Sequence, residues 1–320
     1  MTIQKSIHYF KASLESMQLS KHTLKAYLQD LAQWQTFAQV ENLEDLNFEI
    51  LQEYLMNLQS LNLKPATLRR KRVVLHRFLT FCYEKRLCEE KLYEYIDPVR
   101  MRKIKAPKEV LTSEEIEELF DYIEGQIDNN EQLLGSSNHY DYLYYCWVRN
   151  KLLVGLLLYT GCRATEAVSL KKSDINIKNN TIVLLAKGLK YNVVPIHPEL
   201  LTLLLDYDQK INQLKNPEIL LNIETSEYQF PSRQDGKTHL STRTLHDLML
   251  KLSGVLGRHI HAHLFRHTFA SYCIAANMDI TTLSSLISHS NPSITLSIYT
   301  HEIESTQKQS EIKKLNFDRR

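Results

Sequence analysis

The sequence HAHLFRHTFASYCIAANMDITTLSSLISHSNPSITLSIYTH, residues 261–301, concentrates side chains that can act on a phosphate group. His263 and Arg266 stand near its beginning, His289 follows, and Tyr299 stands near its end. An arginine offers a permanent planar fork to phosphate oxygens, and a histidine can exchange a proton near neutral pH. A tyrosine hydroxyl can act as a covalent nucleophile. These residue types predict phosphoryl transfer without a metal ion.

The length and composition of the chain predict two globular, mostly helical domains. The chain has 320 residues, of which 43% are hydrophobic, and only eight glycines and eight prolines. Its 39 basic and 37 acidic residues leave a net charge of +2. This near balance gives no argument for a nucleic-acid partner, so any DNA-binding surface must come from local clusters of charge.

Cysteine usage and hydropathy predict a soluble cytoplasmic protein that does not enter a membrane. The cysteines are odd in number, scattered, and lack the C-x-x-C spacing of a zinc site. They are Cys82, Cys88, Cys146, Cys162 and Cys273. The strongest apolar run, residues 152–159, is too short to cross a bilayer, and the N-terminus shows no secretory signal.

Residues up to about Ile96 are expected to form helices, and the helix after Pro65 carries the basic run RRKR. Its buried stripe is expected to contain Leu68, Leu75, Phe78, Leu79 and Cys82. Its outer side is expected to carry Arg69, Arg70, Lys71, Arg72 and Arg77. A solvated helix face explains this basic run, and so does a helix laid against DNA phosphates.

Residues 97–108, DPVRMRKIKAPK, are expected to link two domains. Two prolines interrupt helix and favour extended chain there. The segment also carries four cations: Arg100, Arg102, Lys103 and Lys105. This charge would suit a strap along a DNA backbone, although an ordinary basic linker explains it as well.

The second half of the chain opens with a helix-capping signal and then a polar segment. Thr112 or Ser113 with the glutamates that follow can cap a helix. Residues 125–141 are polar and rich in turn formers, which indicates a loop or an insertion. Helix is expected again from Tyr142, and Gly161 is suited to end it.

A small sheet is expected after Gly161. Short strands are predicted at residues 174–177, 181–185 and 192–196, with Asn179-Asn180 and residues 187–190 at the turns. Helices resume at Pro198. The predicted fold class is therefore mainly α, with a helical N-terminal domain and a mostly helical α+β C-terminal domain that contains a small antiparallel sheet.

Four segments in the second half of the chain have residue patterns, in an order along the sequence, that are typical of one family. They are YTGCRATEAVSLKKSDI (159–175), AKGLKYNVVP (186–195), HLFRHTFAS (263–271) and LISHSNPSITLSIYTH (286–301). Together they resemble the sequence boxes of the tyrosine recombinases, the integrase and Xer family. This resemblance implies a catalytic set of Arg163, Lys187, His263, Arg266, His289 and Tyr299, with Glu166 supporting Arg163.

The resemblance implies DNA cleavage through a 3′-phosphotyrosyl link to Tyr299, without a cofactor, a metal or ATP. Arg163 and Arg266 would bracket the non-bridging oxygens, and His289 would add a third donor. His263 is the candidate base for Tyr299, and Lys187 the candidate acid for the leaving 5′-oxygen.

The sequence departs from the family pattern at several positions. Phe265 replaces a leucine, Ser288 replaces a glycine, and Asn192 stands where the hairpin often has a basic residue. Ser288 reduces the freedom of the backbone, and Asn192 weakens an expected DNA contact. His267, beside Arg266, is expected to be a structural helix residue.

The resemblance also implies a domain plan. Residues 1–97 would form the helical core DNA-binding domain, with the pattern S-x-x-T-x-x-x-Y at Ser20, Thr23 and Tyr27. Residues 98–110 would be the basic linker and residues 111–320 the catalytic domain, with a tail from about residue 302. Candidate DNA contacts are Arg69, Arg70, Arg72, Arg100, Arg102 and Lys103.

The implied partner is a double-stranded DNA recombination site. The protein would form a dimer on each site and a homo-tetramer on paired sites, or assemble with a second, different recombinase. The tail would pack onto a neighbouring subunit. Chromosome dimer resolution and service to a phage, a transposon or an integron all remain open.

Two other functions fit parts of the pattern. A type IB topoisomerase shares the same residue types and would relax supercoiled DNA as a monomer. A catalytically silent DNA-binding accessory protein would keep the fold without the chemistry. The intact set of six catalytic residues argues against that loss.

Overall fold

A computed structural model describes residues 1–17, 19, 21–96, 109–186, 190–234, 236–288, 291–293, 295–296 and 299 of the chain. The chain divides into two compact units, residues 1–105 and 106–320, and each unit has a hydrophobic core of its own. Most of the expected linker lies outside the described residues. Among the helices that are described, none is both long enough and apolar enough to cross a membrane.

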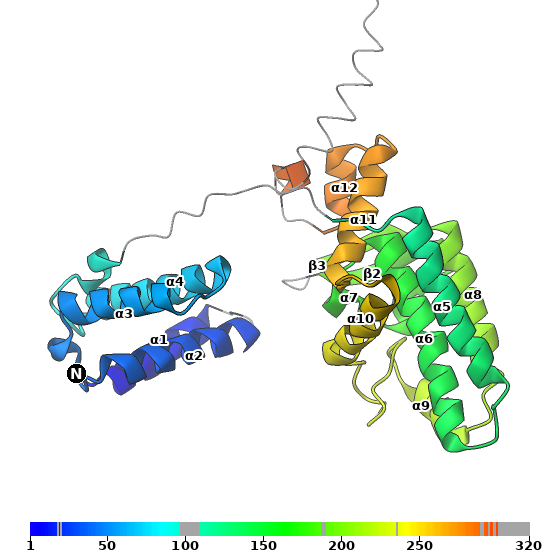
Figure 1. Ribbon diagram of the computed structural model, residues 1–320, viewed down its shortest axis with the longest axis horizontal. Coiled ribbons are helices and arrows are strands. Elements are labelled where there is room, and N and C mark those ends of the chain that lie inside the picture. Colours follow the sequence, from blue (N-terminus) through cyan, green and yellow to red (C-terminus); the bar gives the residue numbers. More distant parts are fainter. Residues whose placement is uncertain are drawn as a thin grey trace, which may run out of the picture. The chain divides into compact units, whose positions relative to one another are not determined.

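Helices build the first unit (Figure 1): α1 (Ile3–Ser16), α2 (Lys21–Ala38), α3 (Phe48–Ser60) and α4 (Pro65–Glu84). Two 3-10 turns, η1 (Leu43–Asp45) and η2 (Leu92–Tyr95), complete it. Aromatic rings fill the centre of its core. The Phe78 ring lies 5.6 Å from that of Phe10 and 5.7 Å from that of Trp34, both edge to face. Ser20, the expected helix cap, lies outside the described residues.

Helix α4 buries most of the expected apolar stripe, namely Leu75, Phe78, Leu79 and Cys82, with Leu68 partly buried. The prediction that Lys71 lies on the outer side is wrong, because its side chain is buried. Its Nζ lies 3.0 Å from Asp30 Oδ1 and also donates to Gln33. Position 71 precedes two stripe residues by four and seven positions, so the helical period places it on the buried face. The carboxylate of Asp30 compensates its charge there.

The second unit is also mostly helical (Figure 1). Its helices are α5 (Ser113–Glu131), α6 (Asn138–Thr160), α7 (Ala164–Val168), α8 (Pro198–Ile211), α9 (Pro217–Thr225), α10 (Thr242–Leu256), α11 (Ala262–Ala275) and α12 (Ile280–Leu286). The expected cap is present at α5, where Thr112 and Glu115 form a capping box. Pro198 begins α8 as expected.

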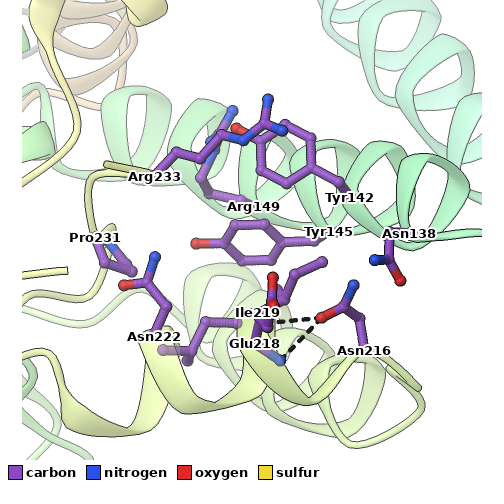
Figure 2. Close-up of a pocket in the computed structure, with 11 residues that line it drawn as sticks. Asn138, Tyr142, Tyr145, Arg149, Asn216, Glu218, Ile219, Asn222, Pro231 and Arg233 are labelled. Atoms are coloured by element: carbon purple, nitrogen blue, oxygen red, sulfur yellow. Dashed lines mark hydrogen bonds between the residues drawn. The ribbon is translucent and has the colours of Figure 1, made fainter. Parts of the chain in front are cut away.

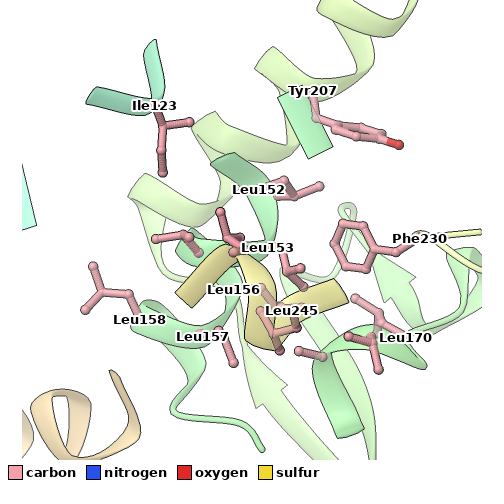
Figure 3. Packing of buried hydrophobic residues seen from close by; sticks show 14 of the residues in the cluster. Ile123, Leu152, Leu153, Leu156, Leu157, Leu158, Leu170, Tyr207, Phe230 and Leu245 are labelled. Atoms are coloured by element: carbon pink, nitrogen blue, oxygen red, sulfur yellow. The ribbon is translucent and has the colours of Figure 1, made fainter. Parts of the chain in front are cut away.

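Helix α6 is the central element of the second unit and contacts α5, α7, α8 and α11. Every residue from Leu152 to Leu158 is buried, as is typical of a helix surrounded by other elements. Figure 3 shows the leucines of this stretch packed with Leu170, Phe230 and Leu245. Gly155 permits the close approach of α8, because an added Cβ would lie 2.2 Å from Leu203 Cδ1.

The expected loop at residues 125–141 is largely wrong. Helix α5 continues through Gly125 to Glu131, and α6 already begins at Asn138. Asp128 and Asn129 of this helix are exposed, while Ile123 and Ile127 on the opposite face are fully buried. Two buried isoleucines one turn apart therefore hold the helix together across the glycine.

The sheet has the predicted antiparallel form, with strand order β1-β2-β3. Its strands are β1 (Ile175–Asn176), β2 (Thr181–Ala186) and β3 (Lys190–Pro195), and Val183 pairs with Val193. Asn180 adopts a φ of 50° in the turn between β1 and β2, a left-handed conformation that asparagine tolerates.

Candidate active site

Arg163 is held at the junction of α6 and α7. Helix α6 ends at Thr160 and is capped by Gly161, whose φ is 60°; an added Cβ there would lie 2.5 Å from Phe269. Arg163 caps the short helix α7, and its backbone N–H and Nη1 donate to the two carboxylate oxygens of Glu166 at 2.8 and 2.7 Å. Glu166 is buried. This bidentate contact fixes the direction of the guanidinium.

Arg266 comes from α11 and is also buried. Its Nη1 donates to the Gly161 carbonyl at 2.9 Å, and its Nη2 donates to the Ile287 carbonyl. Burial, with the nearby charge of Arg163, lowers the pKa of Arg266 to about 10. The guanidinium therefore stays charged at neutral pH. Two carbonyls use only part of its five N–H groups.

The two arginines meet at the end of α12. Arg163 Nη2 donates to the Ser288 carbonyl at 3.2 Å, beside the Ile287 carbonyl that Arg266 contacts. Ser288 has a φ of 53°, in the left-handed region that favours glycine. A glycine, which the family pattern has at this position, would adopt this conformation without a steric cost.

His263 lies in the first turn of α11 and is exposed. Partial desolvation of its imidazole lowers its pKa below the ordinary value, and the charges of Arg266, His261 and Arg163 lower it further. The imidazole is therefore neutral at neutral pH, the form that can accept a proton.

Tyr299 is buried in a small cluster with Ala270, Cys273, Leu283 and Ile287. Its hydroxyl lies 2.7 Å from Nδ1 of His267, with the two rings edge to face at 5.9 Å. His267 was expected to have only a structural role, so this contact was missed. The sequence does carry a signal for it, because His263 and His267 are four residues apart and share one face of α11. Their ring centroids lie 6.3 Å apart.

Two of the expected catalytic residues, Lys187 and His289, lie outside the described residues. Asn192, which stands where the family hairpin often has a basic residue, ties the hairpin to α12; the expected weaker DNA contact stays a prediction. Its Nδ2 donates to the Leu286 carbonyl at 2.8 Å. In the described part of the chain, no group of three His, Cys, Asp or Glu side chains could hold a metal ion.

The candidate DNA contacts of the first unit lie along α4. Arg69 and Arg70 are exposed, but Arg70 Nε lies 2.9 Å from Asp30 Oδ2, so part of its charge is compensated. Arg72 is half-buried, and its Nε has no hydrogen-bond partner among the residues that the structure describes. Arg100, Arg102 and Lys103 lie outside the described residues. Tyr27 is the last residue of the S-x-x-T-x-x-x-Y pattern that was expected in the DNA-binding domain. Its ring centroid lies 5.8 Å from Cζ of Arg77.

Comparisons with known proteins cover both units. The family model described as "Phage integrase family" matches residues 109–305, and "Phage integrase, N-terminal SAM-like domain" matches residues 7–86. Tyrosine recombinase XerC from Staphylococcus aureus strain JH9 is 30% identical over 288 residues, which cover 88% of this chain and 86% of the relative.

Two solved structures are similar in fold. One is the XerH site-specific recombinase bound to a palindromic difH substrate after cleavage, with a TM-score of 0.65 at 18% identity. The match covers 91% of this chain and 80% of that one. The other is a lambda integrase tetramer bound to a Holliday junction, with a TM-score of 0.65 at 15% identity, covering 93% and 77% of the two chains.

Proposed function

This chain belongs to the phage integrase family of tyrosine recombinases, which cut and rejoin DNA at specific sites, and we propose that Tyr299 is its nucleophile. One observation carries the proposal. Segments far apart in the sequence, at Arg163, Arg266 and Tyr299, converge on the end of α12, where Ile287 contacts both Arg266 and the Tyr299 cluster.

The two guanidiniums are suited to hold the scissile phosphate. Each is fixed by a protein partner, Arg163 by Glu166 and Arg266 by the Gly161 carbonyl, and each keeps further N–H groups for phosphate oxygens. Negative charge on those oxygens grows as the pentavalent transition state forms. Preoriented charge-assisted hydrogen bonds therefore strengthen as the reaction proceeds.

In the proposed reaction the Tyr299 oxygen bonds to phosphorus, and the bond from phosphorus to the 5′-oxygen breaks. The phenol proton passes to a histidine, and the leaving 5′-oxygen takes a proton from Lys187. His263 is neutral and serves as the base, while His267 positions the hydroxyl before cleavage. A second 5′-hydroxyl then attacks the phosphotyrosyl link and reseals the strand. The Arg163–Glu166 pair stays in place throughout.

We further propose a dimer on each DNA site and a tetramer on paired sites, acting in the cytoplasm, where the DNA lies. The lambda integrase tetramer on a Holliday junction supports this assembly. An apolar groove of about 610 Å³ lies in the second unit, lined among others by Leu158, Phe269, Tyr272 and Met278. The tail from about residue 302 of a neighbouring copy is its proposed occupant, because that tail offers apolar residues at intervals: Ile303, Ile312, Leu315 and Phe317.

Covalent trapping on DNA tests the nucleophile. The substrate is a nicked duplex carrying the candidate site from DNA that flanks the gene, and the adduct is resolved on a denaturing gel. We expect an adduct with the unchanged protein and with Tyr140→Phe, an exposed tyrosine on α6, and none with Tyr299→Phe. An adduct that survives Tyr299→Phe contradicts the assignment.

The same experiment separates the alternative functions. Relaxation of supercoiled plasmid without any recombination site would indicate topoisomerase activity. A substrate that is bound but never becomes covalently linked would indicate an accessory protein. Joining of two sites in one reaction, with exchanged strands, is the outcome expected for a recombinase.

A further inference from the structure

A second site with the chemistry to bind an anion lies within the second unit, away from Tyr299. The first half of α6, helix α9 and the segment around Pro231 and Arg233 enclose a cavity of about 260 Å³ (Figure 2). Its walls carry the side chains of Tyr142, Tyr145 and Arg149 from α6. Residues 149 and 160 are separated by roughly 17 Å along the helix axis, so this cavity is distinct from the catalytic arginines.

Arg149 lines this cavity although it is only 4% exposed. Within the described residues, its hydrogen bonds go to a single neutral oxygen, Oδ1 of Asn150, from Nε at 3.3 Å and from Nη2 at 2.9 Å. Three tyrosines, Tyr142, Tyr145 and Tyr207, act on it electrostatically. Burial raises the pKa of each phenol, so none of the three supplies a negative charge at neutral pH. In the described part of the chain no carboxylate pairs with Arg149. A buried cation without a counter-charge is costly, and a bound anion would remove that cost.

Arg233 brings a second cation to the same cavity. Its Cζ lies 4.1 Å from the centre of the Tyr142 ring, and the ring thereby presents the guanidinium at the cavity wall. Burial raises the pKa of Tyr142, and the charges of both Arg149 and Arg233 oppose that rise, so both guanidiniums act on one phenol. Figure 2 shows the two arginines on the same side of the cavity. The two positive charges repel each other, and an anion bound between them would offset this repulsion.

The remaining lining is compatible with a small anion. Asn138 contributes an amide group, and Tyr145 and Ile219 contribute apolar surface. The Nδ2 of Asn222 already donates to the Ser232 carbonyl at 3.1 Å. Glu218 also lines the cavity, but it is exposed and makes no ion pair with either arginine among the described contacts. Because Arg149 is buried, a phosphate of an intact DNA duplex cannot reach it. The ligand must enter the cavity.

We propose that this cavity binds a small molecule with an oxyanion group, a phosphate monoester or a carboxylate, held by the guanidiniums of Arg149 and Arg233. Guanidinium forks match both kinds of oxyanion geometrically. A bound ligand would connect α6, α9 and the segment leading to α10, and would stabilise the folded chain by mass action.

Titration of the full chain tests the proposal, with inorganic phosphate, adenosine monophosphate and acetate as probes at constant ionic strength. The midpoint of thermal unfolding and the heat of binding are measured. We expect saturable binding of at least one probe, weakened about tenfold or more in Arg233→Ala. Arg243→Ala, which removes an exposed arginine of α10, should bind as the unchanged chain does. Binding of phosphate but not acetate would indicate a phosphate ligand, and binding of acetate but not phosphate would indicate a carboxylate.

Two further variants keep the result unambiguous. The catalytic arginines can also hold phosphate, so binding is repeated in Arg163→Ala. Binding that survives Arg163→Ala and is lost in Arg233→Ala supports the cavity, and the reverse overturns the proposal. Arg149→Met, which replaces the buried charge by an apolar chain of similar length, should fold and lose the ligand. If it does not fold, Arg233→Ala still decides. Absence of saturable binding by all three probes also overturns it.

Discussion

The contact between the Tyr299 hydroxyl and Nδ1 of His267 is the feature of the site that the family pattern does not predict. The pattern names His263, one turn earlier on α11, and leaves His267 without a role. The structure places His267 2.7 Å from the phenol oxygen of a buried tyrosine. A nucleophile held in one orientation needs less reorganisation before it attacks.

We predict that His267 positions Tyr299 and that His263 sets the pH dependence of cleavage. His267→Phe keeps a ring of similar size but removes the hydrogen-bonding nitrogen, and should slow adduct formation roughly tenfold. His267→Asn places an amide group near the position of Nδ1 and should recover much of the rate. A purely structural role would give no such recovery. Single-turnover adduct formation on the nicked substrate measures both variants.

The pH profile supplies the second readout. Because the folded-state pKa of His263 lies below 6.5, its base form persists through neutral pH, and the rate should fall only as the pH drops below that value. His267→Phe should keep this acid limb, and His263→Gln should abolish it together with most of the rate. An acid limb that disappears in His267→Phe would instead make His267 the base.

At the scale of elements, hydrophobic spacing predicted the helices and the hairpin well, and the errors have a common cause. The loop expected at residues 125–141 was read from its polar residues and its glycine, although Ile123 and Ile127 already mark a buried face. Lys71 was expected on the outer face of α4 because of its charge. Its position in the helical period lies on the buried face, and the Asp30 carboxylate compensates its positive charge. In both cases residue type was given more weight than helical period. Partners distant in sequence, such as Asp30 for Lys71, cannot be read from one sequence.

Substitution of Gly125 tests the continuity of α5. Nothing lies within 4 Å of an added Cβ at this position, so Gly125→Ala should raise the free energy of unfolding by about 0.5–1 kcal/mol through helix propensity. Gly161→Ala is the matched control: with a φ of 60° and Phe269 2.5 Å from the added Cβ, it should lower the free energy of unfolding by more than about 1 kcal/mol. Thermal unfolding of the full chain measures both. Destabilisation by Gly125→Ala would contradict a continuous α5.

At the scale of the whole molecule, the second unit contains both the buried Tyr299, the proposed nucleophile, and an apolar groove. Phe269 contributes to the groove and also packs against the Tyr299 cluster. A segment bound in the groove would therefore contact Phe269, which packs against the cluster that contains Tyr299. This link gives a physical route by which one copy of the chain can control cleavage by another.

Mixing two inactive chains tests that route. One chain lacks residues 303–320 but keeps Tyr299, and the other is full length with Tyr299→Phe. If the tail acts on a neighbour, neither chain alone should form an adduct, and the mixture should form one in which only the truncated chain is linked to DNA. The two chains differ in mass, so the denaturing gel identifies the linked one.

The groove itself supplies the control for this mixture. Tyr272→Glu in the truncated chain places a charge on an exposed groove residue and should suppress the rescue, because burying a carboxylate against an apolar tail is costly. The same substitution in the full-length Tyr299→Phe chain should have no effect, because that chain only donates its tail. Equal suppression from either side would mean that both grooves must be filled, as in a closed ring of subunits. Full activity of the truncated chain alone would show that the tail is not needed for cleavage.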